Sequence, residues 1–408
     1  RIVIGKDTRR SSYMFEYALS AGITAAGADA YLMHVTTTPS VSFIARAEDF
    51  SCGVMISASH NPFYDNGLKV INGNGEKVSD DFIEEIEAYL DGKTGEIPLA
   101  KRDKIGRTVD YSAGRNRYIG YLISLAMHSF KGRKVALDCA NGSASSVAKA
   151  VFDALGADTH VLSNTPNGYN INDHCGSTHI EALQAYVRNS DCEIGFAYDG
   201  DADRCLAVDS EGNLVDGDMI LYLCGKNLKK KGQLQGNTIV TTVMSNFGLY
   251  KVLDAEGISY EKTQVGDRYV YENMAEHAYD LGGEQSGHII FMRHATTGDG
   301  ILTSIKLMEV LLEEKKSLKE CLSDYKTFPQ VLENVRVTDK ALAESNPAVK
   351  EAVKEVEEKL GDTGRILLRA SGTEPLIRVM VEAEKEETCK SLVEEVIAVM
   401  KKEGLVLS

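Results

Sequence analysis

Short apolar runs alternate with amphipathic stretches over the first two thirds of the chain. The apolar runs are rich in β-branched residues and predict strands at residues 1–5, 28–35, 53–57, 133–138, 158–162, 192–197, 238–243 and 257–262. Between them, apolar residues recur at helical spacing and predict helices at residues 14–27, 145–156 and 180–190. Gly156 and Gly257 end such stretches and are typical of helix C-caps. The alternation predicts α/β units with mixed, largely parallel sheets and helices on both faces.

The strand, turn and helix pattern restarts near Arg133 and again near Gly236, which predicts three similar α/β domains. From about Val331 the order becomes strand, acidic helix, two strands and a last helix. That order predicts a C-terminal α+β domain with an antiparallel sheet. We therefore expect four domains, at residues 1–112, 113–215, 216–330 and 331–408.

Composition narrows the class of protein. The 408 residues are 43% apolar and 26% charged, as in ordinary soluble globular proteins. A net charge of −15 argues against a nucleic-acid partner. No apolar run reaches the ~20 residues that a membrane helix needs, so we expect no membrane partner. The eight cysteines form no C-x-x-C pair and lie mostly among apolar residues, which indicates reduced thiols in a cytoplasmic protein.

An acidic loop, YDGDADR, follows one of the predicted strands. Its carboxylates, at Asp199, Asp201 and Asp203, repel one another unless a hard cation such as Mg²⁺ binds them. Alternate residues of a straight strand lie about 6.5–7 Å apart, so the loop must curl to share one ion. Gly200 favours that curl. An EF-hand is excluded, because its sixth and twelfth positions would be arginine and serine, whereas an acidic surface turn stays an alternative.

Magnesium in proteins usually bridges phosphoryl oxygens, so the chain should also hold a phosphate cradle. RASGTEPLIR, between two predicted strands, combines two guanidinium groups, two hydroxyls and a glycine turn that can bind an anion. GKDTRR, after the first strand, is a second basic loop. Taken singly, each could also be a plain surface loop.

Two further segments carry polar groups after apolar runs. In ISASHNP, Ser59 and His60 follow the strand predicted at residues 53–57, and the segment is either a simple loop or a serine presented for chemistry. In LGGEQSGH, Glu284 and Ser286 suit hydrogen bonds to sugar hydroxyls. His288 could transfer protons near neutral pH, or it could be a structural histidine. VGDRY adds another arginine beside a glycine turn.

Together these segments resemble the α-D-phosphohexomutase superfamily, and the resemblance spans essentially the whole chain. It rests on an S-H-N-P serine loop, a D-G-D-x-D-R metal loop, a G-E-x-S-G-H sugar loop and an R-x-S-G-T-E-P phosphate loop, in that order. The resemblance implies the predicted four domains arranged around a central active-site cleft. SASHNPFYDNGLK, VGDRY and GGEQSGHII are most similar to bacterial members that interconvert glucosamine 6-phosphate and glucosamine 1-phosphate for UDP-N-acetylglucosamine synthesis.

The resemblance also implies roles for single residues. Ser59 would carry the transferable phosphate, His60 and Lys69 would assist proton transfer, and two arginines would steady the serine phosphate or the reacting sugar. The predicted catalytic residues are Ser59, His60, Lys69, Arg9, Arg204 and His288. The predicted magnesium ligands are Ser59, Asp199, Asp201 and Asp203. The predicted substrate-binding residues are Asp267, Arg268, Glu284, Ser286, Arg369, Ser371, Gly372, Thr373 and Arg378.

One Mg²⁺ per chain, a phosphosugar substrate and glucosamine or glucose 1,6-bisphosphate as activator follow from the same resemblance, in a monomer or homodimer. The segment G-T-D/S-G-x-R-G that usually opens such chains is not found here, so we expect a first domain without one strand and one anion-binding arginine. Ala370 stands where the glucosamine-specific members commonly have proline. A mutase for glucose or mannose phosphates is therefore an alternative, as are a non-catalytic phosphosugar-binding protein and a metal-dependent phosphatase.

Overall fold

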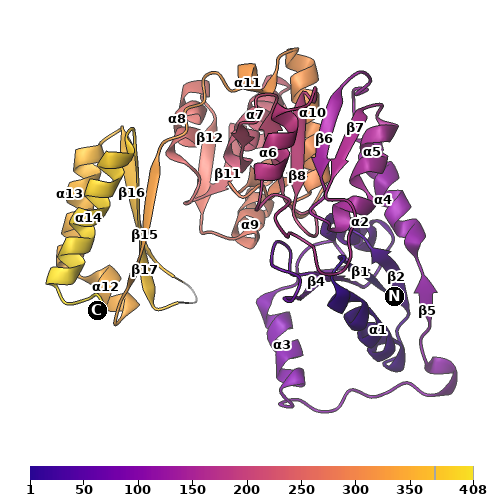
Figure 1. Cartoon of the computed structure of the whole chain (residues 1–408). Helices are drawn as coiled ribbons and strands as arrows, with labels where there is room; N and C mark the ends of the chain where they lie inside the picture. The colour runs from indigo at the N-terminus through magenta and orange to yellow at the C-terminus, as the bar shows by residue number, and fades with distance from the viewer. Residues whose placement is uncertain (372–373, 408) are drawn as a thin grey trace. The chain divides into compact units, whose positions relative to one another are not determined.

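The structure, a computed structural model, describes residues 1–371 and 374–407 (Figure 1). Its described residues divide into two compact units. The units are formed by Arg1–Ser245 with Glu256–Ser323, and by Asn246–Ala255 with Asp324–Ser408. Within the described residues, the first unit holds three β-sheets and the second holds one.

The first sheet has the strand order β4-β3-β1-β2-β5, in which β4 is antiparallel and the other strands are parallel. Its strands are β1 (Ile2–Lys6), β2 (Ala30–Val35), β3 (Cys52–Ile56), β4 (Leu68–Asn72) and β5 (Thr108–Asp110). The helices of this region are α1 (Arg10–Ala25), α2 (Thr38–Ala47), α3 (Asp80–Leu90) and α4 (Ser112–Ser124), and η1 (Arg102–Lys104) is a short 3₁₀ turn.

Neighbouring residues of β1 enter different cores, because successive strand side chains point to opposite faces. Val3 packs with Val41 and Ile44 of α2. Ile4 packs with apolar side chains of α1 that include Leu19 and Ile23. The sheet is therefore covered by helices on both faces, as its continuous apolar strands predict.

The second sheet has the order β10-β9-β8-β6-β7. Strands β6, β7 and β8 are parallel, β9 is antiparallel to β8, and β10 is antiparallel to β9. Its strands are β6 (Lys134–Asp138), β7 (Asp158–Leu162), β8 (Ile194–Tyr198), β9 (Cys205–Asp209) and β10 (Leu214–Val215). Its helical segments are η2 (Ser143–Ser146), α5 (Ala148–Ala154) and α6 (Glu181–Arg188). The helix predicted at residues 145–156 is thus wrong in its first turns, which form a 3₁₀ turn and a break at Val147.

The third sheet has the order β12-β11-β13-β14, with β14 antiparallel to β13. Its strands are β11 (Thr238–Thr242), β12 (Ser259–Thr263), β13 (Leu281–Gly283) and β14 (Ile289–Phe291). The helical segments of this region are α7 (Gly217–Lys230), η3 (Gln235–Asn237), α9 (Asp267–His277), α10 (Gly300–Glu314) and α11 (Leu318–Cys321), and α10 packs on β8 and β9 of the second sheet. Mixed, largely parallel sheets are confirmed in all three regions of the first unit.

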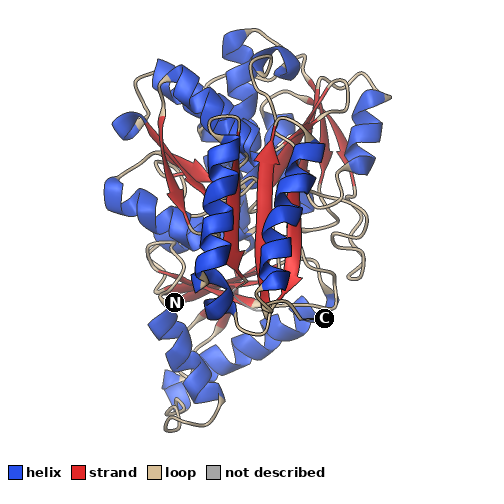
Figure 2. Cartoon of the chain, turned by 90° about the vertical axis from the view of Figure 1, so that its left-hand side faces the viewer, coloured by secondary structure: helices blue, strands red, loops and turns tan. Residues whose placement is uncertain are grey.

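The second unit contains the antiparallel sheet β15-β17-β16, which confirms the α+β prediction for the tail. Its elements are α8 (Phe247–Glu256), β15 (Gln330–Arg336), α12 (Lys340–Ser345), α13 (Pro347–Leu360), β16 (Gly364–Ala370), β17 (Leu376–Ala383) and α14 (Glu386–Lys402). Figure 2 shows two long helices side by side over one face of this sheet, and they are α13 and α14. Their apolar stripes, for example Val356 and Val396, bury Val379 of β17. Glu382 ties α8 to the sheet by accepting a hydrogen bond from the Phe247 backbone N–H (2.9 Å).

Smaller predictions are also settled. Gly156 and Gly257 follow α5 and α8 with positive φ, which confirms both C-caps. All eight cysteines are free, six of them buried. Among the described residues, we find no helix both long and apolar enough to cross a bilayer.

Candidate active site

The predicted metal loop leaves the end of β8 and turns back into β9, which lies antiparallel to it. The turn brings one carboxylate oxygen each of Asp199, Asp201 and Asp203 within 4.8 Å of one another. The prediction that the segment curls is confirmed, but the prediction that Gly200 provides the curl is wrong. The left-handed residue of the loop is Ala202 (φ 57°). Gly200 is required instead for a close approach, because a Cβ there would lie 2.5 Å from the Ser59 carbonyl oxygen.

The chemistry of the three carboxylates fits a divalent cation. All three side chains are buried, and Oδ1 of Asp201 and Oδ1 of Asp203 accept no hydrogen bond from the described residues. Lys69 Nζ lies 2.5 Å from Asp201 Oδ2 and 3.1 Å from Asp203 Oδ2. One ammonium group paired with two of the three buried carboxylates leaves negative charge that a metal ion would neutralise.

The pKa values of Asp199 and Asp203 are shifted in opposite directions. Burial and the neighbouring charges of Asp203 and Asp201 raise the pKa of Asp199 well above its usual range. Burial also raises the pKa of Asp203, but Lys69 and His288 outweigh burial and hold it well below its usual range. Such divergence is typical of functional sites, where burial and close like charges are arranged together.

Ser59 is held directly over this cluster. Its Oγ donates a hydrogen bond to Asp199 Oδ2 (2.5 Å), and His60 Nδ1 lies 3.4 Å from the same Oγ. Ser59 adopts a left-handed backbone (φ 51°), a conformation that non-glycine residues keep only when their surroundings impose it. Burial and the charge of Arg204 lower the pKa of His60, which favours a neutral imidazole able to accept a proton.

The structure places Arg9 against the backbone of the serine loop, and its predicted catalytic role stays a prediction. Arg9 is fully buried beneath the serine loop, where its guanidinium donates to the carbonyl oxygens of Ser59 (3.1 Å) and Asn61 (2.6 Å) and pairs with Asp7. In this arrangement the guanidinium of Arg9 fixes the backbone of the serine loop, while its Nε has no hydrogen-bond partner among the described residues. Asn172, which the motifs did not single out, donates to the same two carbonyl oxygens at 2.9 and 3.0 Å.

The sugar loop spans the end of β13 and the start of β14. Glu284 Oε1 accepts a hydrogen bond from the Gly266 backbone N–H (3.1 Å), which joins the sugar loop to the VGDRY segment. The Cys205 backbone N–H donates to the Gly287 carbonyl oxygen (3.0 Å), which joins it to the second sheet. His288 is buried, with Nδ1 3.8 Å from Asp203 Oδ1 and Nε2 3.6 Å from Asp267 Oδ2.

A cavity of about 480 Å³ collects these groups. Of the predicted residues it is lined by Ser59, His60, Lys69, Asp203, Arg204, Asp267, Glu284, Ser286 and His288. Gln285 of the sugar loop also lines it, as do Lys77, Thr242 and Met244, to which no motif pointed. Segments from all three sheets of the first unit therefore meet at one surface.

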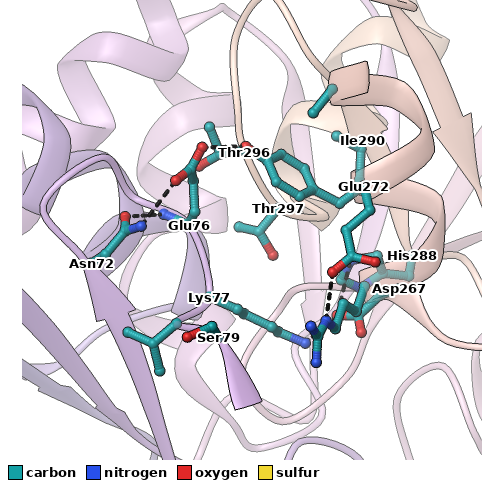
Figure 3. A pocket seen from close by; sticks show the side chains of 14 residues that line it. Asn72, Glu76, Lys77, Ser79, Asp267, Glu272, His288, Ile290, Thr296 and Thr297 are labelled. Carbon is teal, nitrogen blue, oxygen red and sulfur yellow. Dashed lines mark hydrogen bonds and ion pairs between the residues drawn. The ribbon is translucent and has the colours of Figure 1, made fainter. Parts of the chain in front are cut away.

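Arg268 does not share this surface with its neighbour Asp267. It lines an adjacent cavity of about 410 Å³ (Figure 3), where it pairs with Asp80 and, at 2.7 Å, with Glu272. Its predicted substrate-binding role stays a prediction, since in this arrangement the guanidinium is paired on the side of the second cavity.

The phosphate loop lies in the second unit, between β16 and β17. Arg369 and Arg378 face each other directly in the antiparallel ladder, and the Nε atoms of both are buried without a hydrogen-bond partner among the described residues. Burial and the charge of Arg378 lower the pKa of Arg369. Ser371 is buried, whereas the predicted residues Gly372 and Thr373 lie outside the described residues. Two opposed guanidiniums with unused donors fit an anion.

The comparisons with known proteins agree with this geometry. Sequence families described as the alpha/beta/alpha domains I, II and III and the C-terminal domain of phosphoglucomutase/phosphomannomutase match residues 1–96, 116–212, 216–328 and 332–399. The chain belongs to the phosphoglucomutase/phosphomannomutase family. As a member of it, the protein is an isomerase of the phosphohexomutase class, and the resemblance predicted from its motifs is confirmed.

Three named proteins show how similar the chain is to other members of the family. A phosphoglucosamine mutase of Lachnospira eligens is 63% identical over 404 residues, which are 99% of this chain and 90% of the relative. A phosphoglucomutase/phosphomannomutase family protein of Burkholderia thailandensis has the same fold, with a TM-score of 0.80 at 22% identity over 99% of this chain and 89% of that one. Aspergillus fumigatus N-acetylphosphoglucosamine mutase, in complex with GlcNAc-6P and magnesium, has a TM-score of 0.70 at 20% identity over 90% and 93% of the two chains.

Proposed function

We propose that this protein is a phosphoglucosamine mutase, which interconverts glucosamine 6-phosphate and glucosamine 1-phosphate through a phosphoserine and a 1,6-bisphosphate. The observation that carries the proposal is Ser59 Oγ, 2.5 Å from the buried carboxylate cluster and at the wall of a cavity shared with the sugar loop. The 63% identity to a phosphoglucosamine mutase supports the choice of sugar.

In the proposed reaction, the bond between phosphorus and Oγ of phosphorylated Ser59 breaks as the free sugar hydroxyl attacks phosphorus. The hydroxyl proton passes to a neighbouring base, for which the neutral imidazole of His60 is suited. Lys69 and Arg204 stabilise negative charge on the phosphoryl oxygens. The bisphosphate then turns end for end. Ser59 Oγ attacks its other phosphorus, the bond from that phosphorus to the sugar oxygen breaks, and the sugar oxygen takes back the proton from the base.

The carboxylates of Asp199, Asp201 and Asp203, with the Ser59 phosphate, would hold one Mg²⁺, and bound magnesium would neutralise charge on the phosphoryl group. Buried, unpartnered oxygens of Asp201 and Asp203 support this assignment. Glucosamine or glucose 1,6-bisphosphate would act as the activator, because it can phosphorylate an empty serine.

Substrate-binding residues are proposed in each unit separately. Glu284 and Ser286 would bind sugar hydroxyls, and His288 would stay a proton-transfer candidate beside Asp203. Arg369 and Arg378, whose Nε donors are unused, would bind the phosphate that is not reacting. The remaining proposed phosphate ligands are Ser371, Gly372 and Thr373.

The four predicted divisions of the chain, at residues 1–112, 113–215, 216–330 and 331–408, would each contribute one part: serine, metal, sugar and phosphate loop. The four family matches at residues 1–96, 116–212, 216–328 and 332–399 support this division. The oligomeric state, monomer or homodimer, stays a prediction.

The test is ³¹P NMR of glucosamine 6-phosphate with the protein, Mg²⁺ and a trace of hexose 1,6-bisphosphate. We expect a glucosamine 1-phosphate signal to grow to a constant ratio. Ser59→Ala should abolish interconversion while the protein stays folded, and EDTA should abolish it until Mg²⁺ is restored.

Three results would contradict the proposal. Release of free phosphate alone would indicate a phosphatase, and faster conversion of glucose or mannose phosphates would indicate the other mutases of the family. Full activity of the Ser59→Ala variant would refute the assignment of Ser59 as the residue that carries the phosphate.

A further inference from the structure

Glucosamine 6-phosphate differs from glucose 6-phosphate only at C2, where an amine replaces a hydroxyl. Near neutral pH much of this amine is a cation, since amines beside electron-withdrawing groups have pKa values of about 8. A site that prefers glucosamine therefore needs a negative group directed at C2, because neutral sugar-binding groups serve both sugars equally.

Three carboxylates line the cavity that contains Ser59, among the residues that the structure describes: Asp203, Asp267 and Glu284. Asp203 belongs to the metal cluster and is paired with Lys69. Glu284 Oε1 already accepts the Gly266 backbone N–H. Asp267 is the carboxylate that neither the metal cluster nor the sugar loop uses.

The position of Asp267 is fixed from several sides. It is the first residue of α9, where the helix dipole favours a carboxylate. Lys77, which follows β4, pairs with Oδ2, and His288 Nε2 lies 3.6 Å from the same oxygen. Figure 3 shows Lys77 reaching toward Asp267 and His288 at the boundary between the two cavities.

One face of Asp267 remains available. Its side chain is 25% exposed, and within the described part of the chain its Oδ1 accepts no hydrogen bond. Burial raises the pKa of Asp267, but His288 and Lys77 outweigh burial and lower it, so the group is ionised at neutral pH. A fixed, charged carboxylate with a free oxygen is the arrangement that binds an ammonium group.

We propose that Asp267 is the residue that selects glucosamine phosphates, by binding the 2-ammonium group through Oδ1 while Lys77 holds Oδ2. This inference rests on the proposed mutase function. Asp267 acts as a specificity-determining residue, and Lys77 acts through it as a positioning residue.

The experiment compares glucosamine 6-phosphate with glucose 6-phosphate in the wild-type protein and in Asp267→Asn, which keeps shape and removes charge. For glucosamine 6-phosphate we expect kcat/KM to fall about ten- to hundredfold, the range lost with a charge-assisted hydrogen bond. The loss should lie mainly in KM, because C2 does not react. For glucose 6-phosphate the value should change less than about threefold, because no ammonium contact is lost.

Glu272→Gln is the matched control. Glu272 lies on the same helix but lines the adjacent cavity, so its variant should keep the wild-type preference. Lys77→Met gives a second test, because it releases Asp267 Oδ2 from the ion pair that positions it and should lower the preference for glucosamine.

Equal losses on both sugars in Asp267→Asn, or no loss on either, would overturn the inference and leave the mutase intact. An unchanged preference in Lys77→Met would overturn the positioning role of Lys77. A wild-type protein that converts no glucosamine 6-phosphate would refute the proposed function itself, so the two failures are distinguishable.

Discussion

At the scale of single residues, the candidate site depends on a serine held in an unfavourable backbone conformation. The left-handed φ of Ser59 persists because its carbonyl oxygen accepts hydrogen bonds from Arg9 and Asn172, and its N–H donates to Ser57 Oγ (3.0 Å). These contacts place Oγ over Asp199. Side chains packed around the loop therefore determine where Ser59 Oγ lies.

We predict that Asn172→Ala lowers kcat about tenfold with little change in KM. The variant loses the donors to the carbonyl oxygens of Ser59 and Asn61, each hydrogen bond being worth about 1 kcal/mol. Steady-state kinetics on glucosamine 6-phosphate would measure this. Asn189→Ala is the control, since Asn189 is exposed and its amide donates to Ala185 of its own helix. Unchanged kcat in Asn172→Ala would show that Arg9 and Ser57 suffice.

At the scale of elements, the serine and metal loops both follow the carboxyl ends of parallel strands, β3 and β8. Open α/β sheets usually bind ligands at this edge. The two loops approach so closely that Gly200 must have no side chain, because its Cβ would lie 2.5 Å from the Ser59 carbonyl oxygen and 2.8 Å from Ile171. The absence of a side chain at Gly200 thus sets the distance between Ser59 and the carboxylate cluster.

Gly200→Ala should reduce activity about a hundredfold, because displacements near 1 Å in a catalytic site have effects of that size. The same change at Gly120, an exposed helix position with nothing within 4 Å of its Cβ, should leave activity unchanged and stabilise the fold by about 0.5–1 kcal/mol. Kinetics and thermal unfolding of both variants would measure the contrast. Equal activity in the two variants would contradict the close-approach explanation.

At the scale of the whole molecule, backbone contacts join the three sheets of the first unit at the site. The Thr38 N–H donates to the Asp201 carbonyl oxygen (3.0 Å), and the Gly300 N–H donates to the Ala202 carbonyl oxygen (3.0 Å). Behind them, Tyr118 donates to Asp299 Oδ2 (2.7 Å), which links α4 to the start of α10. The metal loop is therefore supported by regions from both sides of the sequence.

The buried Asp299 makes the stability of this assembly depend on pH. Burial raises its pKa to about 6, from an ordinary value of 3.8. The folded chain binds this proton more tightly than the unfolded chain, so the contribution to stability is complete below about pH 4 and is lost as the pH rises through 6. The difference amounts to at most about 3 kcal/mol.

Asp299→Asn removes this titration. Relative to wild type, we expect its melting temperature to rise by several degrees between pH 4.5 and pH 7.5, whatever constant offset the altered hydrogen bonds introduce. Calorimetry at the two pH values would measure the difference. A difference between the proteins that does not depend on pH would show that Asp299 keeps its ordinary pKa.

Features that depend on neighbours in the chain were predictable. Alternating apolar runs predicted β1, β6 and β8 because strand periodicity is local. The carboxylate cluster was predictable because its three residues share one loop, and repulsion within five residues requires a cation wherever that loop lies. The opposed pair Arg369 and Arg378 likewise follows from a hairpin whose strands adjoin in sequence.

Contacts between distant segments were decided only by the tertiary structure. Arg9 carries the same charge on the surface or in the core. Only the packing of the serine loop against it shows that its guanidinium donates to backbone carbonyl oxygens of that loop. Asp267 and Arg268 are adjacent in sequence, yet Asp267 lines both cavities whereas Arg268 lines only the one without Ser59. Lys77 meets Asp267 across 190 residues. The sequence alone determined which chemical groups are present and the local elements that carry them, because those depend on short-range periodicity. The fold decided which groups meet, because burial and pairing depend on the whole packed chain.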